Sequence, residues 1–485
     1  MPFLPFSVMK YVARKRAILT PLPQGQQPVC AGACNRPVFG TRNERRPLTE
    51  IPYREVLPMT AGVNAAGHLT IGGCDVVALA AEFGTPLYVY DEHTIRAMCR
   101  AFVGGFETEY PDSHVSYSSK AFADPTLARI LEEERVGVDV VTGGELAVAR
   151  AAGFPADAIN FHGNNKGRVE LQEALDYGIG LITVDSMYEI DLLDEVAREK
   201  GVTQQILLRV SPSIDGHTHL LTSTGVLDQK FGFPIETGQA QEAVVHALGK
   251  SNLDLAGVHF HLGSPIFELE PYTQAIPYVL EFVARMREHG LEQRIFSPGG
   301  GFAVGYVPGS PPPEISEYAA AIGASIREAC DRLGLSEPRL IVEPGRAIVG
   351  RAGVAVYSVG GIKDIPGVRK YVSVDGGMGD NIRPALYGAE YSVVKANGPA
   401  EPATDTVTIA GKYCESGDLL VKDAVLPTLN PGDVLVVAAS GAYCLSMASN
   451  YNMSLRPPVV LVNDGEARLI RRRETYDDLL AVSIT

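Results

Sequence analysis

The stretch VSYSSKAFADPTLARILEEERVGVDVVTGGEL, residues 115–146, has the pattern of a strand, a helix and a second strand. VSYSSK (115–120) and VGVDVVT (136–142) are short apolar runs of the kind that form buried strands. Between them, Asp124 and Pro125 are residue types that commonly begin a helix. Strands that are connected through a helix pair in parallel, so this stretch predicts one β-α-β unit.

The same alternation continues along the chain. Six more strand candidates follow the first two: INFHG (159–163), LITVD (181–185), ILLRV (206–210), AGVHFHLG (256–263), RIFSPGG (294–300) and RLIVEPG (339–345). Most of them are separated by helical patterns such as YTQAIPYVLEFVARMREHG (272–290). Eight consecutive β-α units predict a (β/α)8 TIM-type barrel.

The sequence beyond the last barrel strand has a different residue pattern. After residue 346, short β-type runs such as DVLVVAASGAY (433–443) alternate with Gly, Pro and Asp. They predict a second, C-terminal β-barrel or sandwich domain, residues 346–485. We expect this domain to take in the strands that precede the barrel, in residues 59–92. The barrel itself is assigned to residues 93–345.

Residues 1–58 are assigned to a disordered N-terminal extension. The first 46 residues carry many basic residues and a single acid, Glu44. Such a leader is also typical of a transit peptide, and a reading frame that starts upstream of Met59 would give the same pattern.

The overall composition excludes several classes of partner. The 485 residues are 46% hydrophobic and carry a formal net charge of -15, so no nucleic-acid partner is expected. The seven cysteines are odd in number and scattered, which predicts free thiols rather than a disulfide framework. Cys30 and Cys34 have no matching second pair, so no metal site is predicted. No apolar run approaches the roughly 18 residues of a spanning helix, so no membrane partner is expected.

Lys120 stands at the end of the first barrel strand candidate. In a TIM barrel the catalytic face lies at the C-terminal ends of the strands. A lysine at a strand end most often reaches solvent and has no chemical role. The alternative is a Schiff-base lysine, whose amine is activated by apolar or cationic surroundings.

Glycines and histidines share this face of the predicted barrel. Gly299, Gly300 and Gly301 could form only a tight loop, or they could offer backbone N–H groups to a phosphate. His259 and His261 point to the same face of a strand, where each could simply pack. His261 is nearer the mouth of the barrel, so it is the one that could lie against a flat ring.

Glu343 and Arg346 could form an ordinary structural ion pair. Pro344 and Gly345 between them nevertheless predict an irregular backbone that would aim both side chains into the mouth of the barrel. Together with Lys120 and the glycine run, these residues describe a pyridoxal 5′-phosphate site. Glu343 would keep the pyridine nitrogen protonated, which makes the ring a better acceptor of electrons from the substrate Cα.

Longer motifs extend through the chain: YSSKAF (117–122), DVVTGGEL (139–146), HGNNK (162–166), HTHLLTSTG with DQKFG (217–232), HFHLGS (259–264), SPGGG (297–301), EPGR (343–346), IRPALYGA (382–389), CESGD (414–418) and GAYCLSMASNYN (441–452). With these motifs the chain resembles the diaminopimelate decarboxylase family, in the alanine-racemase-like class of pyridoxal phosphate enzymes. The resemblance extends from about residue 85 to residue 465.

The resemblance implies roles for individual residues. The implied cofactor-binding residues are Lys120, His261, Ser264, Gly299, Gly300, Gly301, Glu343, Gly345, Arg346 and Tyr443. The implied substrate-binding residues are Arg346, Arg383, Tyr387, Glu415 and Tyr443. Lys120 would be the Schiff-base residue, and Cys414 would return a proton to the substrate. In the family the CESGD segment comes from the neighbouring subunit, so a homodimer with shared active sites is expected.

The implied reaction is the decarboxylation of meso-2,6-diaminopimelate to L-lysine and carbon dioxide, the last step of lysine biosynthesis. This substrate carries an amino acid group at each end. The distal carboxylate suits the guanidinium groups of Arg346 and Arg383, and the distal ammonium suits Glu415. Ornithine and lysine are therefore expected to be poor substrates. The expected location is cytoplasmic, with a plastid as the alternative if the leader is a transit peptide.

Three other functions remain open at this point. A racemase would need a second acid–base residue on the opposite face of the substrate Cα. A decarboxylase for arginine, ornithine or a carboxylated polyamine would keep the cofactor residues and change the distal pocket, notably Arg383 and Glu415. A non-enzymatic pyridoxal phosphate carrier would need only the barrel.

Overall fold

The computed structural model describes residues 51–214, 216 and 227–484. All of its helices and strands lie in one compact unit, Leu48–Thr485. The HTHLLTSTG motif (217–225) and the first 50 residues of the predicted N-terminal extension lie outside the described residues. Among the described helices, none is both long and apolar enough to cross a membrane.

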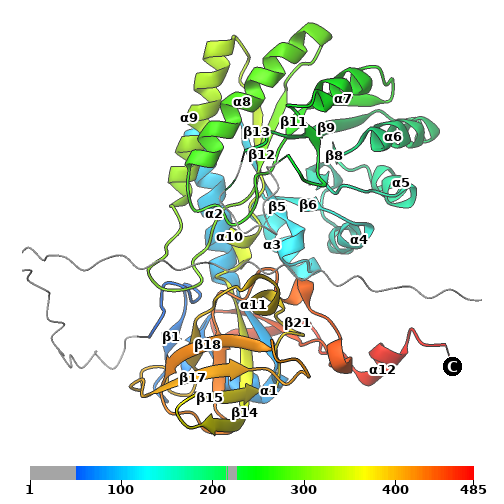
Figure 1. Ribbon diagram of the computed structural model, residues 1–485. Coiled ribbons are helices and arrows are strands. Elements are labelled where there is room, and N and C mark those ends of the chain that lie inside the picture. Colours follow the sequence, from blue (N-terminus) through cyan, green and yellow to red (C-terminus); the bar gives the residue numbers. More distant parts are fainter. Residues whose placement is uncertain (1–50, 215, 217–226, 485) are drawn as a thin grey trace, which may run out of the picture. The chain divides into compact units, whose positions relative to one another are not determined.

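Eight parallel strands close into a barrel, as the sequence predicts (Figure 1). They are β5 (Ser113–Ser118), β6 (Gly137–Val140), β7 (Ile159–Phe161), β8 (Leu181–Val184), β9 (Gln204–Ser211), β11 (Leu253–His259), β12 (Ile295–Gly299) and β13 (Arg339–Val342). Each strand pairs in parallel with the next, and β13 pairs with β5 to close the ring. The very short strand β10 (Phe233–Pro234) also pairs with β9.

Helices connect the barrel strands and surround them. They are α2 (Glu92–Glu109), which precedes β5, and α3 (Pro125–Glu133), α4 (Gly143–Ala152), α5 (Arg168–Tyr177), α6 (Met187–Lys200), α7 (Gln239–Leu248), α8 (Glu270–Met286) and α9 (Ile315–Leu333). Helix α3 begins where the sequence predicts, because the Asp124 side chain accepts a hydrogen bond from the Thr126 N–H (2.7 Å) and Pro125 occupies the first turn.

The second domain is a sheet built around the long strand β14 (Gly353–Ile365). The strand order is β18-β17-β15-β14-β4-β20-β21, and β19 pairs with both β14 and β16. The other members are β4 (Leu87–Asp91), β15 (Arg369–Val374), β16 (Val393–Lys395), β17 (Asp405–Ala410), β18 (Leu419–Leu426), β19 (Val434–Val437), β20 (Val459–Asn463) and β21 (Glu466–Arg471). Strand β4 precedes the barrel in sequence, and it joins this sheet between β14 and β20, as predicted.

Residues 51–58, which the sequence analysis assigned to the extension, belong to the folded part of the chain. Val56 and Leu57 are fully buried in an apolar core that they share with residues of the second domain. The carbonyl of Leu57 also accepts a hydrogen bond from Arg351 Nε (2.7 Å). A few apolar side chains anchor this short segment. They are too few to form a periodic pattern that would distinguish the segment from the basic residues before it.

Three smaller strands precede the barrel as a separate antiparallel sheet, β1 (Gly62–Val63), β2 (Leu69–Ile71) and β3 (Cys74–Asp75). Helix α1 (Val76–Phe83) follows them and begins at Asp75, whose side chain accepts from the N–H groups of Val77 and Ala78. The short helices α10 (Arg346–Val349) and α11 (Arg383–Tyr387) follow β13 and β15, and α12 (Tyr476–Leu480) lies near the C-terminus. Helices α10 and α11 each carry an arginine to the site described next.

Candidate active site

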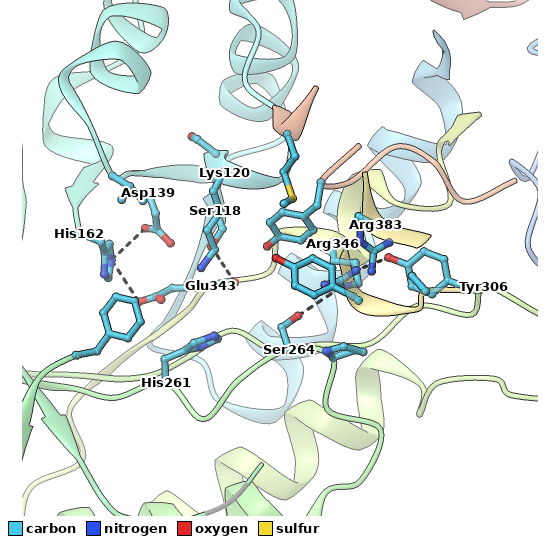
Figure 2. A pocket seen from close by; sticks show the side chains of 18 of the residues that line it. Ser118, Lys120, Asp139, His162, His261, Ser264, Tyr306, Glu343, Arg346 and Arg383 are labelled. Atoms are coloured by element: carbon cyan, nitrogen blue, oxygen red, sulfur yellow. Dashed lines mark hydrogen bonds and ion pairs between the residues drawn. The ribbon is translucent and has the colours of Figure 1, made fainter. Parts of the chain in front are cut away.

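A cavity of about 910 Å³ opens at the C-terminal ends of the barrel strands. Residues that follow β5, β6, β7, β11 and β13 line it, and so do residues of the second domain such as Arg383, Tyr387 and Tyr443. In Figure 2, Lys120, His261 and Glu343 face one side of this space, and the arginines gather on the other side. The cavity is therefore shared by the two domains of the chain.

Lys120 lines the cavity from a 3₁₀ turn, Ser119–Ala121, that directly follows β5. The buried strand ends at Ser118, so the lysine is the first exposed side chain beyond it. The second domain fixes this turn, because the Tyr443 N–H donates to the Ala121 carbonyl (2.9 Å). The Ser446 hydroxyl donates to the same oxygen (3.1 Å). The turn that carries Lys120 is therefore held in place by the second domain.

Glu343 lies at the end of β13 with its carboxylate almost fully buried. The Ser297 hydroxyl donates to Oε1 (2.7 Å), and His259 Nε2 lies 3.2 Å from Oε2. Burial alone would raise the pKa of Glu343, but His259, His162 and the hydroxyl of Ser297 together lower it below its ordinary value. The carboxylate therefore stays ionised and can hold a proton on a neighbouring ring nitrogen.

Three histidines, His162, His259 and His261, lie near the carboxylate of Glu343. Burial lowers the pKa of His162 to about 3. Burial and the nearby Lys120 ammonium lower the pKa of His261 well below its ordinary value. The Gly300 N–H donates to His261 Nδ1 (3.2 Å), so a neutral His261 carries its proton on Nε2. A neutral, flat imidazole at the cavity wall is suited to lie against an aromatic ring.

One atom each of His162, His259 and Glu343 lies within 4.8 Å of the others. That spacing would suit a metal ion as well as the nitrogen of an aromatic ring. The geometry of these three residues alone therefore allows two classes of cofactor.

Asp139 is a buried carboxylate that the sequence analysis did not single out, although it begins the DVVTGGEL motif. It accepts from the Ser116 hydroxyl (2.5 Å) and from Asn160 Nδ2 (3.1 Å). Burial, and then the charge of Glu343, raise the pKa of Asp139 well above its ordinary value. The pKa values of these two neighbouring carboxyl groups are thus shifted in opposite directions, which is the arrangement that separates a proton donor from a proton acceptor.

The three glycines of SPGGG are not among the residues that line the cavity. The Gly299 N–H donates to the Ser297 hydroxyl (3.1 Å), and the Gly300 N–H is used by His261. A Cβ atom on Gly300 would lie 2.1 Å from the Glu343 carbonyl oxygen. Glycine is required here because the ends of β12 and β13 approach so closely. A phosphate-binding role for Gly299–Gly301 stays a prediction.

Arg346 is buried in α10 and makes no ion pair with Glu343, so the structural pair considered from the sequence does not form. Its Nε donates to the Ser264 hydroxyl (3.4 Å), and its NH1 donates to the Tyr306 hydroxyl. Its Cζ lies 4.8 Å from the ring centre of Tyr443. Gly345, just before it, packs against the end of β5, where a Cβ would lie 3.0 Å from that of Ser118.

Arg383 is buried at the start of α11 and lines the same cavity, as does Tyr387 at the end of this helix. Its NH1 donates to the Tyr391 hydroxyl, and its Cζ lies 4.9 Å from the ring centre of Tyr306. Burial alone would lower the pKa of Arg383, but Tyr306 and Tyr391 raise it overall, so the guanidinium keeps its charge.

Arg209, which also lines the cavity, lies 3.9 Å from Asp185, but neither Arg346 nor Arg383 has a carboxylate partner within 4.0 Å among the residues that the structure describes. A buried cation is costly unless an anion compensates it. Arg346 and Arg383 therefore make this side of the cavity a place for an anionic group. The sequence patterns had suggested both arginines, but they gave no sign of Tyr306, which contacts both.

Cys414 and Glu415 do not line the cavity of their own chain. Both are exposed in the connection between β17 and β18. The Cys414 N–H donates to Asn452 Oδ1 (3.2 Å), and the Tyr451 hydroxyl donates to Glu415. Unlike the glycines of SPGGG, which adjoin residues of the cavity wall such as His261 and Glu343, Cys414 and Glu415 contact residues of their own domain that do not line the cavity.

The chain matches the family model for the pyridoxal-dependent decarboxylase, pyridoxal binding domain, over residues 94–350. It is 45% identical over 426 residues to the diaminopimelate decarboxylase of Bacillus subtilis, which covers 88% of this chain and 97% of that protein. Two solved structures of diaminopimelate decarboxylases in complex with L-lysine are also similar. The one from M. jannaschii has a TM-score of 0.82 at 35% identity and covers 88% of this chain and 98% of its own. The one from Helicobacter pylori has a TM-score of 0.77 at 31% identity and covers 84% and 99%.

Proposed function

This chain belongs to the diaminopimelate decarboxylase family, and we propose that it converts meso-diaminopimelate to L-lysine and carbon dioxide in the cavity at the barrel mouth. The observation that carries the proposal is the arrangement of charges in this cavity. An amine and an ionised carboxylate, Lys120 and Glu343, line one side, and two arginines without carboxylate partners line the other. The enzyme is a pyridoxal 5′-phosphate-dependent decarboxylase.

The residues around Lys120 fit this cofactor. Lys120 would hold it covalently, the neutral His261 would lie against its ring, and Glu343 would accept the ring N–H. Ser264 and Gly345, with the glycine run, would hold the phosphate. When bound, pyridoxal phosphate accepts the electron pair that remains on the substrate Cα after the carboxylate leaves. The presence of Lys120 beside the His162, His259 and Glu343 cluster favours pyridoxal phosphate over a metal ion, because a lysine amine suits an aldehyde.

The substrate's distal end fits the opposite side of the cavity. Arg346 and Arg383 can bind a carboxylate through several N–H donors, and Tyr387 and Tyr443 lie beside them. A substrate without this carboxylate would leave two buried cations uncompensated, so ornithine would bind poorly. L-Lysine as the product keeps the distal amino acid group, and relatives of this chain have been crystallised with L-lysine. This geometry favours diaminopimelate over the shorter substrates of related decarboxylases.

We further propose that the enzyme acts as a homodimer in which each cavity is completed by the second copy. Cys414 of the partner subunit would donate its thiol proton to the substrate Cα after carbon dioxide has left. Glu415 of the partner subunit would bind the distal ammonium. The exposure of both residues on their own chain supports this assignment. A cytoplasmic location remains the prediction, with a plastid as the alternative.

Carbon dioxide release from the holoenzyme tests the proposed reaction. Meso-diaminopimelate should be turned over, and ornithine, L-lysine and arginine should not. Lys120→Ala should abolish turnover, whereas Lys363→Ala, which removes an exposed lysine of β14, should leave it unchanged. Turnover of ornithine or arginine in place of diaminopimelate would overturn the assignment of the distal pocket. Full activity of Lys120→Ala would overturn the assignment of the cofactor site.

A further inference from the structure

We propose that Tyr306 is a positioning residue that holds Arg346 and Arg383 together as one carboxylate-binding unit, and that it thereby sets the enzyme's selectivity for ligands with a distal carboxylate. This inference rests on the proposed function and extends it to a residue outside the sequence motifs. Tyr306 lines the cavity beside the two arginines (Figure 2).

Tyr306 contacts each arginine in a different way. Its hydroxyl accepts a hydrogen bond from Arg346 NH1. Its ring centre lies 4.9 Å from Cζ of Arg383 and 5.7 Å from Cζ of Arg346. Tyr306 is therefore the one side chain that the described structure places in contact with both guanidinium groups through its ring.

The position of Tyr306 is itself fixed on two sides. Its carbonyl oxygen accepts from the Ser392 hydroxyl (3.1 Å). Its ring meets the ring of Tyr391 edge to face, with ring centres 5.3 Å apart and an angle of 80° between the planes. Tyr391 in turn accepts a hydrogen bond from Arg383. Two tyrosines and two arginines thus form one connected group, which we call the tyrosine–arginine cluster.

A phenol suits this place better than a carboxylate would. Two neighbouring cations repel each other, and the electron-rich face of an aromatic ring attracts both without carrying a charge. An aspartate or glutamate at this position would neutralise the arginines and compete with the substrate's carboxylate. With Tyr306 in place, both guanidinium groups are oriented and the cavity keeps its positive charge for the ligand.

Comparing inhibition by two ligands distinguishes a role of Tyr306 in carboxylate binding from a general structural role. L-Lysine carries the carboxylate that the arginines would bind, and 1,5-diaminopentane has the same carbon chain and amines without any carboxylate. Tyr306→Phe keeps the ring but removes the oxygen that accepts from Arg346. We expect it to weaken inhibition by L-lysine about tenfold, the effect of one hydrogen bond to a charged group. Inhibition by 1,5-diaminopentane should not change.

The experiment measures both inhibition constants against meso-diaminopimelate with the holoenzyme. The ratio of the two constants is independent of the fraction of folded enzyme, so it remains informative for a less stable variant. Tyr306→Leu, which lacks the ring as well, should change the ratio further than Tyr306→Phe. Tyr110→Phe is the matched control, because its buried hydroxyl bonds to the Pro338 carbonyl (2.7 Å) at residues that do not line the cavity.

The expected kinetic signature of Tyr306→Phe is a raised KM for diaminopimelate with little change in kcat. An unchanged ratio of inhibition constants in both Tyr306 variants would overturn the inference, and so would equal weakening of the two ligands. Wild-type enzyme that fails to decarboxylate diaminopimelate would instead refute the proposed function. The two failures are therefore distinguishable in one set of assays.

Discussion

Replacing Lys166 by methionine should strongly destabilise the barrel, because it would leave a buried carboxylate without its partner. Lys166 and Glu189 are both almost fully buried, and Lys166 Nζ lies 2.7 Å from Glu189 Oε1. The ammonium also donates to the carbonyl oxygens of Gly163 (2.7 Å) and Thr183 (2.8 Å). Gly163 lines the active-site cavity, so this ammonium supports one wall of the site.

The size of the effect follows from the separation of the charges. At an effective dielectric constant of about 20, two unit charges at this distance attract by roughly 6 kcal/mol. Relief from the cost of burying the lysine offsets part of this loss. Removing one partner of a buried ion pair typically costs about 3–5 kcal/mol, and we expect Lys166→Met to fall in this range. The double variant Lys166→Met, Glu189→Gln should recover part of the loss, because no charge is left unpaired.

The pH dependence gives a second signature. Burial raises the pKa of Glu189, and Lys166 at present limits that increase. Without Lys166 the pKa of Glu189 should rise further, so the native state would hold a proton that the unfolded chain releases. The destabilisation should therefore be smaller at pH 5 than at pH 8.

Denaturant unfolding of the holoenzyme at both pH values measures these effects for the wild type, both single variants and the double variant. A loss below about 1 kcal/mol for Lys166→Met, the level of an exposed pair, would refute the reasoning. A loss that does not depend on pH would show that Glu189 does not remain as a buried charge.

Two further predictions concern other buried carboxylates. Glu343→Gln should lower kcat by about tenfold to a hundredfold, because a neutral amide forms a weaker hydrogen bond with a protonated ring nitrogen. Steady-state carbon dioxide release measures kcat. An unchanged kcat would contradict the proposed role of Glu343. Burial raises the pKa of Asp380 to about 7, so the wild type should lose stability as the pH rises from about 4 to 7, since the native state retains the proton longer than the unfolded chain. Asp380→Asn should remove this loss, so its free energy of unfolding should increase by up to about 4 kcal/mol relative to that of the wild type between pH 4 and pH 8. Denaturant unfolding measures this difference. Parallel pH profiles of stability for the two proteins would contradict the prediction.

The barrel could be predicted from the sequence because its strands are short apolar runs with helices between them. Lys120, His261 and Glu343 could be placed at one face for the same reason, since strand ends share an edge of the barrel. The glycine run was harder to interpret. A triple glycine signals close approach of the backbone, and only the structure shows that the neighbour of Gly300 is the carbonyl of Glu343.

Other parts of the site depend on contacts that no local pattern records. Tyr306 lies in a loop after β12, and its two arginines come from α10 and α11, which are distant in the sequence. Asp139 looks like an ordinary polar residue at a strand end until its burial beside Glu343 is known. Val56 and Leu57 were missed because two anchoring side chains give no periodicity.

The most direct test of the proposed shared active site mixes two inactive variants. Lys120→Ala lacks the cofactor lysine but keeps Cys414, and Cys414→Ala has the opposite defect, so each homodimer should have no working cavity. In a mixed dimer, one cavity would combine the intact Lys120 of one chain with the intact Cys414 of the other. After subunit exchange at equal concentrations, carbon dioxide release should recover to about a quarter of the wild-type rate, because half of the dimers would be mixed and each would have one complete site. No recovery, with mixed dimers shown to be present, would contradict an active site completed by the second copy.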